Sequence, residues 1–463
     1  MELNVVAVSY LSLIVFIIFV EILRKKETFV DFLSWFNVIF CLVYPLPAFL
    51  LEADFDHQSI VLMYDTQTSY TTEIRTTIAI FLGYFCVVLG FYNNSAKRFG
   101  KFFIIQKNKN WKLILYSICL LSFAFLSIHL YSSEYGGILL AISQTNLIRA
   151  GAASTETEGT LLFFKQFIFT SFFSSYLLAS IVFIGKMKQN RIAILVIFIL
   201  SVVISFVAVL LSSGRITLIN YCLGFYLVSI ICNGKINLKI IIPGLLCIFL
   251  IIMYGKAFFF SLTAIPNGFE NVMDTFVKTL DNESEKTTKG NHLYTFIINF
   301  VFPVHSLDAS FKESYNPTFF VDLFYAFLSI IPSRILNAIA GIELPLSIAD
   351  LNSVYVLKIT PKPTTIPPGL LAYGIYSMSW PGLIIVSLVY GWIGRFLQSI
   401  LIEYIQDIYW IPFIYVLTLQ VWADFTPTGD LRLYLVNYFW FLLSMTILLV
   451  FIGKIYFRKP TAS

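Results

Sequence analysis

The stretch IAILVIFILSVVISFVAVLLSSGRITLINYCLGFYLVSIIC, residues 192–232, decides the fold. It holds two apolar runs, 192–211 and 216–232. Each run is close to the roughly twenty residues with which a helix crosses the hydrocarbon of a bilayer. Only a few residues separate them, so we expect two membrane-spanning helices joined by a tight turn. Arg215 stands in that turn, and no acidic residue lies near it in sequence.

The rest of the chain repeats this apolar pattern. Of its 463 residues, 58% are hydrophobic and 12% are charged, and the mean hydropathy is +0.82. A soluble domain carries about twice that share of charge. The composition therefore excludes a soluble globular protein. Residues 5–23 follow no basic region and precede no small-residue cleavage site, so we expect them to be the first span rather than a signal peptide.

We predict an all-α polytopic membrane protein with about eleven transmembrane helices. The predicted spans are residues 4–23, 29–51, 76–92, 112–131, 161–184, 192–211, 216–232, 240–256, 380–398, 410–424 and 433–452. Two further apolar stretches, 294–302 and 319–332, are short for a crossing, so interfacial or re-entrant helices are expected there. If both crossed, the count would be thirteen.

The distribution of basic residues predicts the orientation. Short loops on one side carry clusters such as 24–26, 97–112 and 454–459 with few acids beside them, whereas the long loops lie on the other side. The positive-inside rule makes the basic side cytoplasmic, which puts the N-terminus outside and the C-terminus inside. We expect three parts: an N-terminal bundle of about eight spans (1–256), a large external loop region (257–379), and three C-terminal spans (380–463).

Several arginines fall on the external side near the ends of spans, where the positive-inside rule disfavours them. They are Arg149 in a small-residue loop, Arg215 in the turn quoted above, Arg334 in IIPSRIL, and Arg432 beside Asp430. A snorkelling or carboxylate-paired structural arginine is the alternative for each of them. Taken together, external guanidinium groups suit a lipid-linked diphosphate, because they donate bidentately to phosphate oxygens and keep their charge in a half-dry site.

His305 is the candidate general base. Asp308 follows it by three residues, and on a helix this spacing places both side chains on one face. A solvated interfacial pair is the alternative. The D-x-D of Asp54 and Asp56 is a possible metal-binding motif, but no His/Cys/Asp cluster has metal-ligand spacing, and we predict neither a metal nor a cofactor. Neither a Walker A motif nor a G-x-S-x-G motif is found, which disfavours an ATP-driven pump.

The segments LLSSGRITLI and TTIPPGLLAYGIYSMSWPGLIIVSLVYGWIGRFL (364–397) resemble the Wzy-type O-antigen polymerases, which join oligosaccharide repeat units in bacterial inner membranes. Arg215 matches a small-residue-plus-arginine motif of that family, and Arg334 matches its Pro-Arg element with one extra residue. Thr365, Gly369 and Gly382 match the stretch that leads into a late span. Trp380–Pro381 departs from the family's usual Phe-Gly.

The resemblance implies a metal-independent, GT-C-like glycosyltransferase of the bacterial cell inner membrane. Its partners would be undecaprenyl-diphosphate-linked oligosaccharide and membrane lipid, with a chain-length regulator and a flippase of the same pathway, and no nucleic acid. Arg215 and Arg334, with Arg149 as a third, would bind the diphosphate, and His305 would be the base. An O-antigen ligase and a lipid-linked oligosaccharide flippase or transporter are the alternatives; internal repeats, typical of transporters, are not visible.

Overall fold

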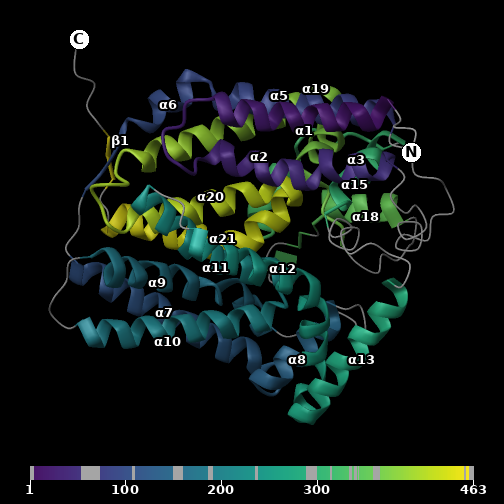
Figure 1. The fold of residues 1–463 in the computed structure, drawn as a ribbon. Helices are drawn as coiled ribbons and strands as arrows, with labels where there is room; N and C mark the ends of the chain where they lie inside the picture. Colours follow the sequence, from purple (N-terminus) through teal and green to yellow (C-terminus); the bar gives the residue numbers. More distant parts are fainter. Residues whose placement is uncertain are drawn as a thin grey trace. The chain divides into compact units, whose positions relative to one another are not determined.

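The computed structural model shows an all-α polytopic membrane protein (Figure 1). It describes residues 5–53, 73–106, 110–149, 160–185, 191–234, 238–287, 300–312, 315–332, 336–337, 341–342, 344–357, 365–452 and 455–457. The helices at the predicted spans are α1 (Val5–Leu23), α2 (Phe32–Val43) with α3 (Pro45–Glu52), α5 (Ile74–Phe91), α7 (Asn110–Ser133), α9 (Thr170–Ala179), α10 (Arg191–Ser212), α11 (Arg215–Asn233), α12 (Leu238–Ser261), α19 (Gly369–Ile402), α20 (Ile411–Thr428) and α21 (Leu431–Ile447).

Shorter elements connect these helices. They are α6 (Asn94–Gly100), β1 (Phe103–Ile105), α8 (Ile138–Arg149), η1 (Thr160–Phe167), η2 (Ser180–Ile184), η3 (Leu262–Asn267), α13 (Phe269–Thr287), α15 (Phe302–Lys312), α16 (Asp322–Leu328), α18 (Ile348–Leu357), η4 (Leu448–Ile452) and β2 (Ile455–Phe457). The external loop expected at 257–379 is thus partly helical. Its apolar stretch 319–332 contains the short helix α16, while most of 294–302 lies outside the described residues.

A helix stands at every one of the eleven predicted spans. Within the described part of the chain, nine helices are long and apolar enough to cross a membrane. A tenth crossing is possible if the pair Ile242–Ile251 and Met253–Asn267, bent by 51°, acts as one span. The remaining prediction, 410–424, corresponds to α20, a helix that is almost wholly buried and is not among the nine. Its polar and aromatic residues lower its hydropathy, and protein covers it instead of lipid.

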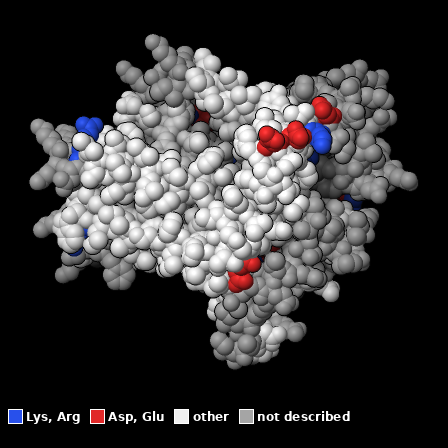
Figure 2. Space-filling model, turned by 90° about the horizontal axis from the view of Figure 1, so that it is seen from below, with Lys and Arg blue, Asp and Glu red and all other residues white. Residues whose placement is uncertain are grey.

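The chain divides into two compact units. Unit 1 comprises Met1–Gly100, Lys289–Ser399 and Leu419–Val436, and unit 2 comprises Lys101–Thr288, Ile400–Thr418 and Asn437–Ser463. This division follows compactness, whereas the three parts expected from the sequence follow membrane topology. The three-part division therefore stays a prediction. Figure 2 shows a face on which most of the described surface carries no charged side chain, in keeping with a protein surrounded by lipid.

Unit 2 is a helix bundle in which aromatic side chains pack between the helices. Its helices α7, α9 and α10 pack against one another, and α8 packs against α10 and η3. The rings of Phe172 and Tyr221 stack with centroids 4.4 Å apart, and the Tyr176 hydroxyl donates to the Tyr221 carbonyl at 2.9 Å. Antiparallel β1 and β2 join a loop after α6 to the C-terminal segment, which puts both of these predicted cytoplasmic segments on one side.

Unit 1 brings α5 and α19 into backbone contact. A side chain at Gly90 would strike the backbone of Leu388, and one at Gly391 would strike the backbone of Val87. Small residues at such positions let two helices approach closely, which is how membrane helices gain packing energy. Beside this contact Tyr390 and Trp422 stack with ring centroids 4.5 Å apart.

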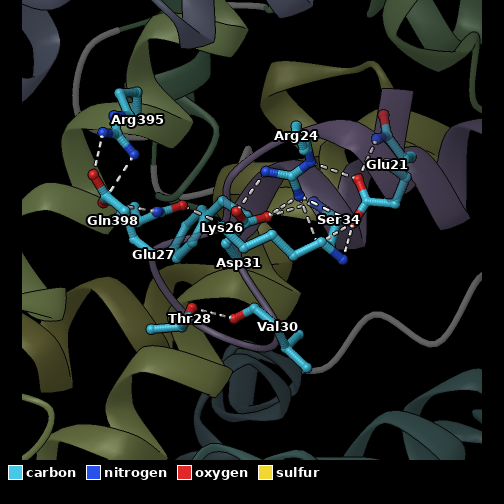
Figure 3. A network of polar contacts seen from close by, with 12 residues as sticks. Glu21, Arg24, Lys26, Glu27, Thr28, Val30, Asp31, Ser34, Arg395 and Gln398 are labelled. Carbon is cyan, nitrogen blue, oxygen red and sulfur yellow. Dashed lines mark hydrogen bonds and ion pairs between the residues drawn. The ribbon is translucent and has the colours of Figure 1, made fainter. Parts of the chain in front are cut away.

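A buried network of charges fastens the end of α1 to the start of α2 (Figure 3). Arg24, only 6% exposed, donates from Nε to Glu21 at 2.7 Å and from Nη1 to Asp31 at 2.6 Å. Its Nη2 also reaches the Ser34 hydroxyl at 2.7 Å. Asp31 caps α2 by accepting from the Ser34 amide at 2.7 Å. Lys26 forms an ion pair with Glu21 at 2.6 Å, so the two acids of this group face two cations.

The same region joins three loops that the charge pattern assigns to one side. Glu27 accepts from Lys97 at 2.8 Å. It also accepts from Arg395 at 2.7 Å and from Gln398 at 3.5 Å (Figure 3). Although burial acts to raise it, hydrogen bonds from Arg395 and Lys97 lower the pKa of Glu27 to about 2. These contacts hold the segments that follow α1 and α5 beside the C-terminal part of α19.

Helix α19 folds back on itself near its start. Met378 and Ser379 have non-helical backbone angles, and Ser379 lies at φ 55°. Because of this break, a Cβ added to Gly374 would meet the Leu383 Cα at 2.6 Å, a contact that a straight helix does not permit. The predicted span beginning at 380 is thus preceded by a separate helical arm, 369–377, which belonged to the expected external loop.

Candidate functional site

Arg215 is the first residue of α11. Ser213, with φ 53°, and the N-cap Gly214 form the turn that ends α10 and starts α11. The left-handed conformation of Ser213 is uncommon for a residue with a side chain. It allows two apolar helices to be joined by only a few residues, and it puts a guanidinium at the positive end of the α11 dipole.

The stem of Arg215 lies against α12. A Cβ added to Gly255 would lie 2.8 Å from the Arg215 Cδ, so only glycine leaves room for the arginine there. Arg215 is half-buried, and the next residue of α12, Lys256, is exposed. The missing side chain at Gly255 therefore makes room for the aliphatic part of Arg215, while the arginine as a whole stays half-buried.

Helix α8 brings a second predicted arginine to the same turn. The Ser213 hydroxyl donates to the Asn146 side-chain oxygen. Arg149 follows Asn146 by one helical turn and ends α8. The hydroxyl of Ser143 donates to the Thr263 carbonyl at 2.6 Å, which ties α8 to η3 as well. The backbone of Arg149 is therefore close to the α10–α11 turn, while its side chain lies outside what the structure describes.

This end of unit 2 is suited to anions. The start of α11 is the positive end of its helix dipole, and Arg215 adds a full positive charge there. The sequence predicted Arg149 and Arg215 as ligands of one diphosphate, and the structure puts their two elements in contact through Asn146 and Ser213. Neither Asn146 nor Ser213 was singled out from the sequence, because a hydrogen bond between distant segments leaves no local pattern.

His305 and Asp308 lie on α15 in unit 1, and both are buried. Burial lowers the pKa of His305 to about 4, against the opposing effect of the Asp308 charge, so the imidazole is neutral at pH 7. One oxygen of the Asp308 carboxylate accepts from the Thr76 hydroxyl at 2.9 Å, and the other forms an ion pair with Lys312 at 2.5 Å. Asp308 therefore also fastens α15 to the start of α5.

Arg432 begins the span of α21 and is paired. Its Nε lies 2.5 Å from an oxygen of Asp322, and its Nη1 donates to the Pro345 carbonyl at 2.6 Å. Asp430, the partner suggested by the sequence, accepts instead from the backbone amides of Ala349 (2.7 Å) and Leu433 (2.9 Å). Asp430 thus holds the starts of α18 and α21, and the arginine has an acid that sequence proximity did not reveal.

The remaining predicted residues lie outside the described part of the chain. These are Arg334, Asp54 and Asp56. Among the residues that are described, no group of three or more His, Cys, Asp or Glu side chains is placed to hold a metal ion.

The chain matches no known protein-family profile, no curated protein and no solved structure. Its function must therefore be inferred from its own residues and their geometry, together with the resemblance of its motifs.

Proposed function

We propose that this protein is a glycosyltransferase that polymerises undecaprenyl-diphosphate-linked oligosaccharide repeats at the periplasmic face of a bacterial inner membrane. In this proposal the N-terminus is periplasmic and the C-terminus cytoplasmic. The observation that carries it is the position of Arg215, at the start of α11 and packed against Gly255, beside the helix that bears Arg149.

The chemistry explains why such an arrangement is needed. The hydroxyl of one lipid-linked repeat attacks the anomeric carbon of the growing glycan and loses its proton. The bond from that carbon to the diphosphate breaks, and its electron pair leaves with the phosphate oxygen. In the proposed site, guanidinium groups and the positive end of the α11 dipole stabilise the charge as it develops on this oxygen. No nucleotide sugar is required, since the lipid diphosphate is itself the leaving group.

His305 remains the predicted proton acceptor. Its neutral imidazole at pH 7 has a lone pair for this role, although the ring is only 4% exposed and must become accessible to the acceptor hydroxyl. Arg334 remains the predicted second ligand of the diphosphate.

Replacement of Arg215 tests the proposal. In a strain that lacks the chromosomal gene, Arg215→Ala should abolish long-chain glycan while single-repeat product and protein level stay normal. Loss of one preorganised donor typically costs about 10²–10³ in rate. Arg215→Lys should restore only short chains, because lysine cannot donate bidentately.

Arg191→Ala is the matched control, because Arg191 also starts a helix but is exposed and lies on the predicted cytoplasmic side. It should leave the glycan ladder unchanged. A normal ladder from Arg215→Ala would reject the polymerase, and loss of the single-repeat product as well would point to the ligase.

A further inference from the structure

In unit 1, a strained turn at Phe319 and Phe320 precedes Asp322, whose side chain is buried in the protein. Phe319 and Phe320 both have φ in the left-handed region, at 47° and 60°, immediately before α16. The turn is held by two backbone hydrogen bonds, from Thr318 to the Tyr376 carbonyl (3.1 Å) and from Phe319 to the Ser377 carbonyl (2.9 Å). As a result Asp322 is only 3% exposed, although the neighbouring Phe324 is 79% exposed.

Asp322 is only half satisfied there. One carboxylate oxygen lies 2.5 Å from the Arg432 Nε. The other oxygen, Oδ2, is buried and has no hydrogen-bond partner among the described residues, and the same is true of the Thr318 hydroxyl one turn earlier. Buried polar atoms are nearly always paired in folded proteins, so these two oxygens have capacity left to accept a hydrogen bond from a bound molecule.

The charges around Asp322 define the kind of ligand. Among the described residues that act on the Asp322 carboxylate, Asp430 is negative and Arg432 is positive, so the two acids together exceed the one guanidinium by one negative charge. Burial and the nearby Asp430 raise the pKa of Asp322 to about 6, against the effect of Arg432. Such surroundings disfavour a phosphate and favour a neutral molecule that donates hydrogen bonds. The half-buried ring of Tyr325, with Arg432 5.1 Å from its centroid, adds an aromatic surface.

We propose that Oδ2 of Asp322 and the hydroxyl of Thr318 form a saccharide subsite, in which the carboxylate accepts a hydrogen bond from a sugar hydroxyl. The choice of a saccharide rests on the proposed function, whereas the preference for a neutral hydroxyl donor rests on the geometry. The subsite lies entirely in unit 1 and takes the carbohydrate, so its chemistry differs from that of the diphosphate site at Arg215.

The test is calorimetric binding of oligosaccharides, obtained by partial acid hydrolysis of the host's surface polysaccharide, to the full-length protein in nanodiscs. Asp322→Asn should weaken binding about tenfold or more, because hydrogen bonds to charged groups are the strong ones. Thr318→Val, which keeps the shape of the side chain, should weaken it severalfold. Asp350→Asn is the control, since the Asp350 carboxylate accepts from the Ser347 amide at 3.1 Å, and binding should be unchanged.

Wild-type protein that does not bind the oligosaccharides would overturn the subsite, as would Asp322→Asn and Thr318→Val variants that bind as wild type does. If Asp322→Asn fails to fold, Thr318→Val decides. Binding that depends on Asp322, together with a normal glycan ladder from Arg215→Ala, would keep the subsite and reject the polymerase. If the oligosaccharides do not bind to the wild-type protein but Arg215→Ala loses the long-chain glycan, the subsite is rejected and the polymerase is kept.

Discussion

Arg24 and Arg432 are both buried arginines of unit 1, and their surroundings differ. Arg24 donates to Glu21, Asp31 and Ser34, and these acceptors are themselves shared within one closed network (Figure 3). Arg432 reaches one oxygen of Asp322 and leaves the other without a partner among the described residues.

The acids of the two regions show the same contrast. Hydrogen bonds from Arg395 and Lys97 outweigh burial and lower the pKa of Glu27 to about 2, whereas burial and Asp430 raise the pKa of Asp322 to about 6. A closed network stabilises the fold and has little to offer a ligand. An acid that is held in place but only half paired costs stability and retains the capacity to bind, which is common at functional sites.

The largest effect is expected from breaking the closed network. Arg24→Met leaves Asp31, 3% exposed on its side chain, without its counter-charge. Removing one partner of a buried ion pair typically costs about 3–5 kcal/mol. Thermal unfolding of the purified variant should have a lower midpoint than that of the wild type, and less folded protein should be obtained on purification. Arg98→Met, an exposed position in the same unit, should change stability by less than about 0.5 kcal/mol. Equal midpoints for the two variants would contradict the comparison.

The pH dependence of Asp322 should give a smaller effect. Its pKa is raised from 3.8 to about 6 in the folded protein, so the folded state binds the proton more tightly than the unfolded state does. Stability should therefore rise as the pH falls through about 6 toward 4. Relative to Asp322→Asn, the free energy of unfolding of the wild type should rise by up to about 3 kcal/mol, since one pKa unit corresponds to about 1.4 kcal/mol.

Denaturation of wild type and Asp322→Asn at pH 7 and at pH 4.5 would measure this difference, with Asp430 and Arg432 kept in both proteins. If the difference in free energy of unfolding between wild type and Asp322→Asn does not change with pH, Asp322 is as well paired as the acids around Arg24.

The smallest effect is expected from Glu27, which is one-third exposed. Glu27→Gln should cost about 1 kcal/mol or less, because water and salt screen such pairs. The lowered pKa means that the contribution of Glu27 is present above pH 4.5 and is lost as the pH falls through about 2. The difference in free energy of unfolding between wild type and Glu27→Gln should become smaller in acid and at high salt. A difference that responds to neither condition would indicate that Glu27 contributes by packing.

Much of the fold could be predicted because apolar length is a strong local signal. Every predicted span is a helix, and the grouping of basic loops agrees with the contact of Glu27 with Lys97 and Arg395. The fold-back of α19 could not be foreseen, since Trp380–Pro381 reads as the start of a span and the arm before it contains Gly369 and Gly374. Tertiary contacts, not local preference, hold that arm in place.

The candidate sites show the same limit. The spacing of His305 and Asp308 predicted a shared helix face, and both indeed lie buried on α15. The pairing of Asp322 with Arg432 joins distant segments, so no spacing rule could indicate it. Asp430 was the nearer acid, but its carboxylate is used by two backbone amides.

The fold-back at Ser379 also imposes a sequence pattern that can identify distant relatives. Gly374 and Gly382 lie on opposite arms and face each other's backbone, so a methyl group on either one would push the arms apart. Neither position can mutate alone without opening the hairpin. Two glycines separated by seven residues, with a Trp-Pro step before the second, thus form a geometric signature that should survive after the surrounding sequence has drifted.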